Sequence, residues 1–72
     1  MTAAQPRKRS VLVAGHETSV SIEPPFWNVL KEIATARGIS LNALITEVDR
    51  GRAGNLSSAL RVFVLEEVKS RR

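Results

Sequence analysis

The segment from Thr18 to Pro25 constrains the fold more than any other part of the chain. Small polar and branched apolar residues alternate from Thr18 to Ile22, a pattern typical of a strand with one buried face. Two prolines then end the strand, because proline lacks the N–H group that a ladder needs and fits the first turn of a helix. A short strand needs a partner, and the simplest partner is the same strand in a second copy.

The composition also favours self-association. The chain has 72 residues, no cysteine and one histidine. A single domain of this length buries only about 60% of its unfolded surface, and chains this short usually need disulfides, a metal or a partner subunit. Disulfides are excluded, and one copy cannot build a metal site from His and Cys. We therefore expect a homodimer without a cofactor.

The charge points to a polyanionic partner. The formal charge is +4 and the isoelectric point is about 10.8, which favours nucleic acid first and an anionic membrane second. No apolar run approaches the roughly 20 residues that span a bilayer, and the run Val11–Ala14 is too short for the core of a signal peptide. We expect a cytoplasmic protein with no membrane contact.

The first nine residues are polar and end in three consecutive basic side chains, Arg7, Lys8 and Arg9. We interpret residues 1–9 as a flexible basic arm and residues 10–72 as the folded domain. The three basic side chains would then reach the phosphate backbone or enter a minor groove. A solvated tail without a role is the alternative.

The residues before the strand over Thr18–Ile22 raise the question of which face their apolar side chains point to. Val11 and Val13 share one face of a strand over Ser10–Ala14, whereas Val20 and Ile22 must face the core. In one unbroken strand, the two pairs would point to opposite faces. Either a bulge near Gly15 reverses the side chains, or residues 14–17 form a hairpin loop. The glycine favours a break there, and the hairpin stays open.

The pattern after the two prolines predicts a helix. Apolar residues recur at Phe26, Leu30, Ile33 and Ala34, which is helical spacing with a wide apolar stripe. Gly38 stands where a left-handed residue would end this helix.

Two further helices are predicted. Ser40 is a suitable N-cap for a second helix, from Leu41 to Asp49 or Arg50. A third helix begins behind Asn55 or Ser57. Its centre also has β propensity, but the flanking Ala, Leu, Arg and Glu residues favour a helix.

The sequence argues against an enzyme. His16 is the only imidazole, no thiol is available as a nucleophile, and no pair of carboxylates suggests acid–base catalysis. A 72-residue chain also has little room for a substrate pocket.

A binding function has a mechanism in the strand. If two copies pair their strands antiparallel, Glu17, Ser19 and Ser21 project from the face opposite Val20 and Ile22. A two-stranded ribbon fits the major groove of DNA, where hydroxyls and a carboxylate can meet base edges. Alternatively, the serines are ordinary solvent-facing residues of a strand.

The predicted second helix adds a phosphate site. Ser40, Leu41 and Asn42 place free N–H groups at the positive end of the helix dipole. Ser40 would also be a cap without any ligand. The predicted dimer core combines strand and helix residues: Val20, Ile22, Trp27, Leu30, Leu44 and Phe63.

These segments resemble a known family. The run Ser19–Ile22 before a proline-opened helix, followed by residues 37–45, is similar to the ribbon-helix-helix pattern of the Arc and methionine repressors. Residues 15–21 and 55–64 more closely resemble a subgroup of small bacterial members. The resemblance implies a mainly helical fold with a short β-ribbon, an intertwined homodimer and a regulator of transcription.

The resemblance assigns base contacts to Glu17, Ser19 and Ser21, and the phosphate clamp to residues 40–42. The ribbon departs from the family pattern, because family members commonly carry Arg, Lys, Gln or Asn at base-facing positions. The third helix is an addition to the minimal pattern. It suggests a second hypothesis, a dimeric interaction module, such as an antitoxin or adaptor, that docks a partner protein through this helix.

Overall fold

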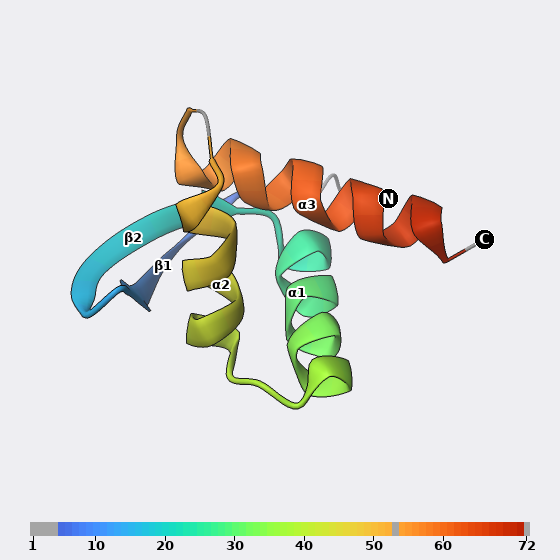
Figure 1. Cartoon of the computed structure of the whole chain (residues 1–72). Coiled ribbons are helices and arrows are strands. Elements are labelled where there is room, and N and C mark those ends of the chain that lie inside the picture. The colour runs from blue at the N-terminus through green and yellow to red at the C-terminus, as the bar shows by residue number, and fades with distance from the viewer. Residues whose placement is uncertain (1–4, 53, 72) are drawn as a thin grey trace.

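The computed structural model describes residues 5–52 and 54–71, which form two strands and three helices. The elements are β1 (Arg7–Val13), β2 (His16–Ile22), α1 (Pro24–Arg37), α2 (Leu41–Arg50) and α3 (Leu56–Ser70). Figure 1 shows the hairpin beside α2, with α3 lying across the start of α1 and the end of α2. The predicted class, mainly helical with a short β-ribbon and a third helix, is confirmed.

The partner of the main strand lies in the same chain. β1 pairs antiparallel with β2, so that Arg7 lies opposite Ile22 and Val13 lies opposite His16. The expectation that the simplest partner is the same strand in a second copy is not met along this edge, because β1 of the same chain lies there. Ala14 and Gly15 form the turn with φ values of 50° and 83°, as a two-residue hairpin of the primed type requires. The hairpin alternative is confirmed, with a turn of two residues, and the bulge is wrong.

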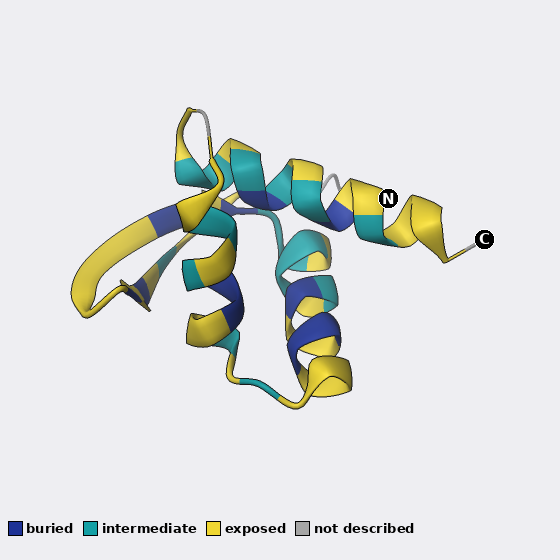
Figure 2. Cartoon of the chain, viewed as in Figure 1, coloured by how far each residue is buried: buried dark blue, intermediate teal, exposed yellow. Residues whose placement is uncertain are grey.

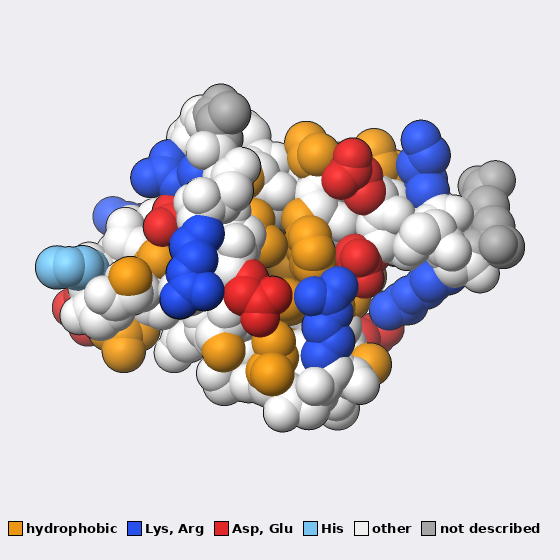
Figure 3. Space-filling model, viewed as in Figure 1, with side chains coloured by type: hydrophobic (Ala, Val, Ile, Leu, Met, Phe, Trp, Pro, Cys, Tyr) orange, Lys and Arg blue, Asp and Glu red, His pale blue; other side chains and the backbone are white. Residues whose placement is uncertain are grey.

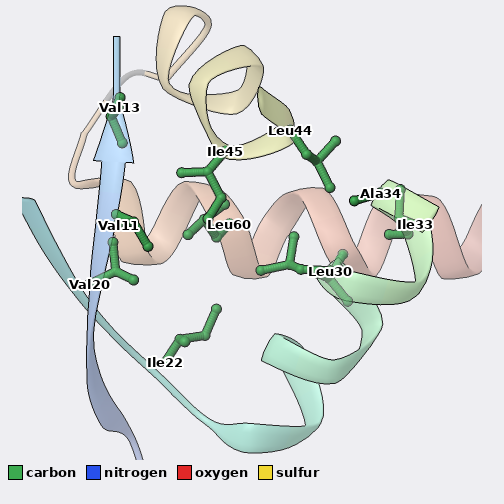
Figure 4. Packing of buried hydrophobic residues seen from close by; sticks show 11 residues of the cluster. Val11, Val13, Val20, Ile22, Leu30, Ile33, Ala34, Leu44, Ile45 and Leu60 are labelled. Carbon is green, nitrogen blue, oxygen red and sulfur yellow. The ribbon is translucent and has the colours of Figure 1, made fainter. Parts of the chain in front are cut away.

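The hairpin also resolves the parity of the valines. Residues directly opposite each other in an antiparallel pair point to the same face. The register places odd-numbered residues of β1 opposite even-numbered residues of β2. Val11, Val13, Val20 and Ile22 consequently share one face, and Figure 4 shows them turned toward the helices. No residue has to be inserted to bury all four side chains.

The predicted basic arm needs correction. Arg7, Lys8 and Arg9 belong to β1 and pair with Ile22, Ser21 and Val20, so they are not part of a flexible arm. Pairing with β2 fixes the backbone of these residues, which a charged, polar sequence alone does not reveal. The folded region includes residues 7–9, ahead of the boundary expected at residue 10. Residues 1–4 of the predicted arm lie outside the described residues.

Each helix boundary has a local cause. Gly38 ends α1 with a φ of 71°, and its N–H group donates to main-chain carbonyls of the last turn. Ser40 caps α2, since its Oγ accepts from the Ala43 N–H at 3.0 Å. Asn55, not Ser57, caps α3, because its Oδ1 accepts from the Ser58 N–H at 2.8 Å. The helical interpretation of the third segment is confirmed.

The core forms between the hairpin and the three helices. Among the described residues, five side chains are completely inaccessible to solvent, and they come from β2 and from all three helices: Ile22, Leu30, Leu44, Ile45 and Leu60. Figures 2 and 4 show the buried residues on the inner sides of these elements. A single copy therefore encloses its own hydrophobic core.

The predicted dimer core consequently belongs to one chain. Val20, Ile22, Leu30 and Leu44 are at most 2% exposed without any partner. Trp27 and Phe63 are half-buried at the margin of the core. The sequence left open whether residues 10–14 pair with this strand. β1 does so, and it supplies from the same chain the apolar side chains that a partner was expected to provide.

Candidate functional site

The hairpin presents one face to the helices and one face to solvent. Six side chains form the solvent face, here called the outward ribbon face: Lys8, Ser10 and Leu12 of β1 with Glu17, Ser19 and Ser21 of β2. All six are exposed, and Figure 2 colours much of the hairpin as exposed. The predicted base-facing residues of β2 therefore lie together on one surface.

The free edge of β1 is held by α2. The N–H group of Leu12 donates to Asn42 Oδ1 at 3.2 Å, and that of Ala14 donates to Thr46 Oγ1 at 3.3 Å. These contacts place the first turns of α2 directly beside β1. They also fix the position of the hairpin relative to the helices, since both acceptors lie on one rigid element.

The free edge of β2 is held by α3. The N–H group of Ser21 donates to Ser57 Oγ at 3.1 Å, and its carbonyl accepts from Arg61 Nη2 at 3.1 Å. Arg61 also binds the carboxylate of Glu23 with both ends of its guanidinium, at 2.8 and 3.3 Å. The hydrogen bond from Arg61 lowers the pKa of Glu23 below its ordinary value, with a smaller contribution from a backbone hydrogen bond.

The start of α2 keeps unpaired hydrogen-bond donors. Ser40 satisfies Ala43, but the N–H groups of Leu41 and Asn42 make no hydrogen bond within the described residues. These donors lie at the positive end of the helix dipole. Because Asn42 also contacts the backbone of β1, the structure places the three predicted phosphate-binding residues beside the ribbon.

The three basic residues of the predicted arm do not act as one group. Arg9 points to the core side of the hairpin, where its guanidinium lies 4.8 Å from the centre of the Trp27 ring. Arg7 lies on the same side of β1 and is exposed. Lys8 points the other way, onto the outward ribbon face. Strand alternation thus separates three neighbours that the sequence suggested would work together.

Sequence reasoning missed the contribution of β1 to this surface. Ser10 and Leu12 were not among the predicted site residues, and Lys8 was predicted as a contact to the phosphate backbone or the minor groove. The reason is that β1 was expected to begin at Ser10 and its partner was unknown. A sequence signal for this strand was present. Lys8, Ser10 and Leu12 alternate with Arg9, Val11 and Val13, and the dipeptide Ala14-Gly15, which can form a turn, follows. The pair formed by Arg61 and Glu23 left no such signal, since the two residues are 38 positions apart.

A second surface lies on α3. Among the described residues, three of the four large hydrophobic side chains that stand exposed are on this helix: Val62, Leu65 and Val68, at 54, 56 and 43%. An open groove of about 490 Å³ runs beside it, between α3, the end of α2 and their connection. Figure 3 shows apolar side chains on α3 and in this hollow, bordered by charged ones.

The described residues contain no group of three or more His, Cys, Asp or Glu side chains that could hold a metal ion. Within the same residues, every helix is too short or too polar to cross a membrane.

Comparisons with known proteins agree with this architecture. A family model described as a ribbon-helix-helix domain matches residues 6–68. The solved structure of an uncharacterized protein from Bordetella pertussis Tohama I superimposes with a TM-score of 0.75 and 34% sequence identity. The match covers 96% of this chain and 63% of that chain, so this chain spans less than two thirds of its neighbour. No curated protein matches.

Proposed function

Because this chain belongs to the ribbon-helix-helix domain family, we propose that it is a homodimeric, sequence-specific DNA-binding regulator of transcription in the cytoplasm. Ribbon-helix-helix domains generally bind DNA as transcription regulators and are not enzymes. One observation carries the proposal: an exposed, polar, two-stranded ribbon lies directly beside a helix N-terminus with free N–H groups.

The ribbon has the dimensions and chemistry of a major-groove ligand. The major groove of B-DNA is about 12 Å wide and admits a two-stranded ribbon. Glu17, Ser19 and Ser21 lie on the face of the hairpin that points away from the helices. Serine hydroxyls donate or accept hydrogen bonds, and a carboxylate accepts from the amino group of cytosine. These three side chains are the proposed base contacts of β2.

The start of α2 supplies the proposed phosphate contact. With the ribbon in the groove, the first turn of α2 lies toward the groove wall, because Asn42 contacts the outer edge of β1. Free N–H groups at a helix N-terminus bind phosphate oxygens. Ser40, Leu41 and Asn42 therefore orient the ribbon, while the ribbon reads the sequence.

A DNA-shift experiment with genomic fragments at several salt concentrations tests the proposal. Phosphate contacts release counterions, so we expect binding to weaken steeply as salt increases. The double variant Ser19→Ala/Ser21→Ala is expected to bind with relaxed sequence preference, whereas the control Thr35→Ala on the exposed side of α1 keeps it. Absence of any DNA shift at low salt contradicts the proposal.

The homodimer of this proposal needs a surface other than the core. The exposed hydrophobic side chains of α3 favour this helix, because apolar side chains that cluster on a surface commonly mark an interface. Analytical ultracentrifugation is expected to show a dimer that Leu65→Glu dissociates, while Leu12→Glu on the ribbon leaves it intact. Dissociation by Leu12→Glu alone would place the interface on the hairpin, and a wild-type monomer at all concentrations would contradict the homodimer.

The same exposed residues favour a second candidate function, docking of a partner protein through α3. In this case, the chain is an adaptor or antitoxin. Affinity capture from the native cell extract is then expected to recover one stoichiometric protein, which Leu65→Glu abolishes. A DNA shift by the wild-type protein, with no partner protein captured, contradicts this candidate and leaves DNA binding in place.

A further inference from the structure

The third helix carries two side chains that bind the end of β2. We propose that Arg61 and Ser57 of α3 are positioning residues for DNA recognition: they hold the backbone of Ser21 so that its short side chain meets a base edge. The inference rests on the proposed function and deepens it, because it gives α3, the addition to the minimal ribbon-helix-helix pattern, a part in sequence selection. Neither residue needs to touch the DNA.

Both main-chain polar groups of Ser21 are bound by α3. The N–H group donates to Ser57 Oγ at 3.1 Å, and the carbonyl accepts from Arg61 Nη2 at 3.1 Å. Residues four positions apart lie on the same face of a helix, one turn from each other. Ser57 and Arg61 therefore act as a pair, here called the α3 clamp. A shift or rotation of the backbone at Ser21 breaks at least one of the two bonds.

Arg61 is itself held in place. Its guanidinium binds both carboxylate oxygens of Glu23, from Nε at 2.8 Å and from Nη2 at 3.3 Å, an arrangement that fixes the plane of the guanidinium. The two side chains are only 30% and 23% exposed. Glu23 also starts α1, because its carbonyl accepts from the N–H group of Trp27 at 3.1 Å. The α3 clamp is thus anchored to the beginning of α1 as well as to α3.

A short side chain depends on this support more than a long one. An O–H···O hydrogen bond requires a separation of about 2.5 to 3.0 Å, and a recognition group must be held within about 0.5 Å of its productive position. A long side chain can follow its target by changing rotamers, whereas a serine hydroxyl lies one bond beyond Cβ. The backbone therefore determines where the exposed hydroxyl of Ser21 lies, and the α3 clamp fixes that backbone.

Ser19 provides a comparison within the same strand. It lies two residues before Ser21 on the outward ribbon face and is also exposed. Within the described residues, no helix side chain binds its main-chain groups. The α3 clamp thus takes the edge of β2 at Ser21 alone and is compatible with pairing of a second copy farther along this edge. Loss of the clamp is expected to change recognition by Ser21 and to spare recognition by Ser19.

The first test selects preferred sites from a random DNA library. Ser19→Ala and Ser21→Ala identify the base position at which each serine sets the preference. Arg61→Ala is then expected to lower the preference at the Ser21 position by about tenfold, the value of one base pair in a specific site, and to change that at the Ser19 position less than twofold. The control Arg50→Ala removes an equal charge from an exposed arginine without an ion pair among the described residues, and it keeps both preferences.

The second test examines the other half of the clamp. Ser57→Ala removes the hydroxyl that accepts from the Ser21 N–H group. It is expected to lower the preference at the Ser21 position by about threefold, since it removes one hydrogen bond. Ser57→Thr retains a hydroxyl and is expected to restore the preference. The neighbouring Ser58→Ala serves as the matched control and leaves it unchanged.

The clamp is also measurable without DNA. Hydrogen exchange at the Ser21 amide is expected to be faster in Ser57→Ala than in the wild type and in Ser58→Ala. Thermal unfolding verifies that each variant is folded. An exchange rate at Ser21 that Ser57→Ala leaves unchanged would mean that another group holds this amide, and the inference would be wrong.

The possible outcomes separate this inference from the proposed function. If Arg61→Ala keeps the full preference at the Ser21 position, or loses preference equally at both serine positions, the positioning role is wrong and DNA binding stands. If Ser21→Ala changes no base preference of a protein that selects its site, the inference is wrong in the same way. If the wild-type protein binds no DNA or binds every sequence equally, both the inference and the proposed function are wrong.

Discussion

The two faces of the hairpin are built from the same two strands and have opposite properties. On the inner face, Val11, Val13, Val20 and Ile22 are at most 7% exposed. On the outward ribbon face, all six side chains are exposed, and only Leu12 is apolar. Neighbouring residues therefore differ in what their replacement changes. The inner face determines the free energy of folding, and the outward face is available for recognition.

This separation depends on two features, the two-residue turn and the bonds that hold the strand edges. The turn sets which residues lie opposite one another, and a register shift of one residue would exchange the two faces. The edge bonds to α2 and α3 fix the hairpin against the helices. Substitutions on the two faces, in the turn and at the two strand edges are therefore expected to change stability by decreasing amounts.

Truncation on the two faces gives the largest expected contrast. Ile22→Ala is expected to lower the free energy of unfolding by about 3 kcal/mol, because Ile22 is fully buried and its truncation leaves a cavity. Ser21→Ala, one residue away, is expected to change it by less than about 0.5 kcal/mol. Urea unfolding measures both. Equal destabilisation by the two variants would mean that the faces are not separated.

Substitutions of Ala14 in the turn are expected to raise the free energy of unfolding, in contrast to truncation in the core. Ala14 has a φ of 50°, a conformation that costs an L residue other than Gly, Asn or Asp about 1 kcal/mol or more. Ala14→Asn and Ala14→Gly keep the N–H group that bonds to Thr46 and relieve this cost. We expect either variant to raise the free energy of unfolding by about 1 kcal/mol. A lower thermal midpoint in both variants would contradict the turn conformation.

The edge of β1 is expected to show a smaller effect. Thr46→Val keeps the shape of the side chain and removes the hydroxyl that accepts from the Ala14 N–H. Loss of one such hydrogen bond costs about 0.5 to 1.5 kcal/mol, toward the lower end at an exposed site. Hydrogen exchange is expected to show faster exchange at Ala14 than in the wild type. An unchanged rate would indicate that α2 does not hold this edge.

The edge of β2 gives a pH-dependent effect, the smallest of the four. The pKa of Glu23 is lowered in the folded chain, first of all by the hydrogen bond from Arg61. A lowered pKa stabilises the folded state at pH values above the unfolded pKa, about 4.3, and this contribution is lost as the pH falls through the folded pKa. Thermal midpoints of the wild type and Glu23→Gln are therefore expected to differ at pH 7 and to converge in acid.

A constant difference between the wild type and Glu23→Gln from pH 7 down to pH 3 would contradict this explanation. It would mean that Glu23 acts through its shape and not through its charge. The variant Glu32→Gln serves as a control, because this exposed glutamate of α1 has no ion pair among the described residues. Its midpoint is expected to follow that of the wild type at every pH.

Much of the fold could be predicted from local signals. Gly38, Ser40 and the two prolines mark helix ends by their backbone conformation or their hydrogen bonds, which depend on neighbouring residues alone. The outward position of Ser19 and Ser21 followed from strand alternation in the same way. The extent of β1 was missed, because Arg7, Lys8 and Arg9 have no local preference for a strand and lie in one through their pairing with residues 20–22.

The sequence by itself determined the type and the order of most elements, because alternation, helical spacing and caps act over a few residues. Only the tertiary structure decided that β2 pairs within the chain, that the predicted dimer core is enclosed by one copy, and that Lys8 and Leu12 share a surface with Ser21 and Glu17. These properties depend on contacts between residues far apart in the chain. Such contacts form only when the hairpin and all three helices pack together, so no short segment encodes them.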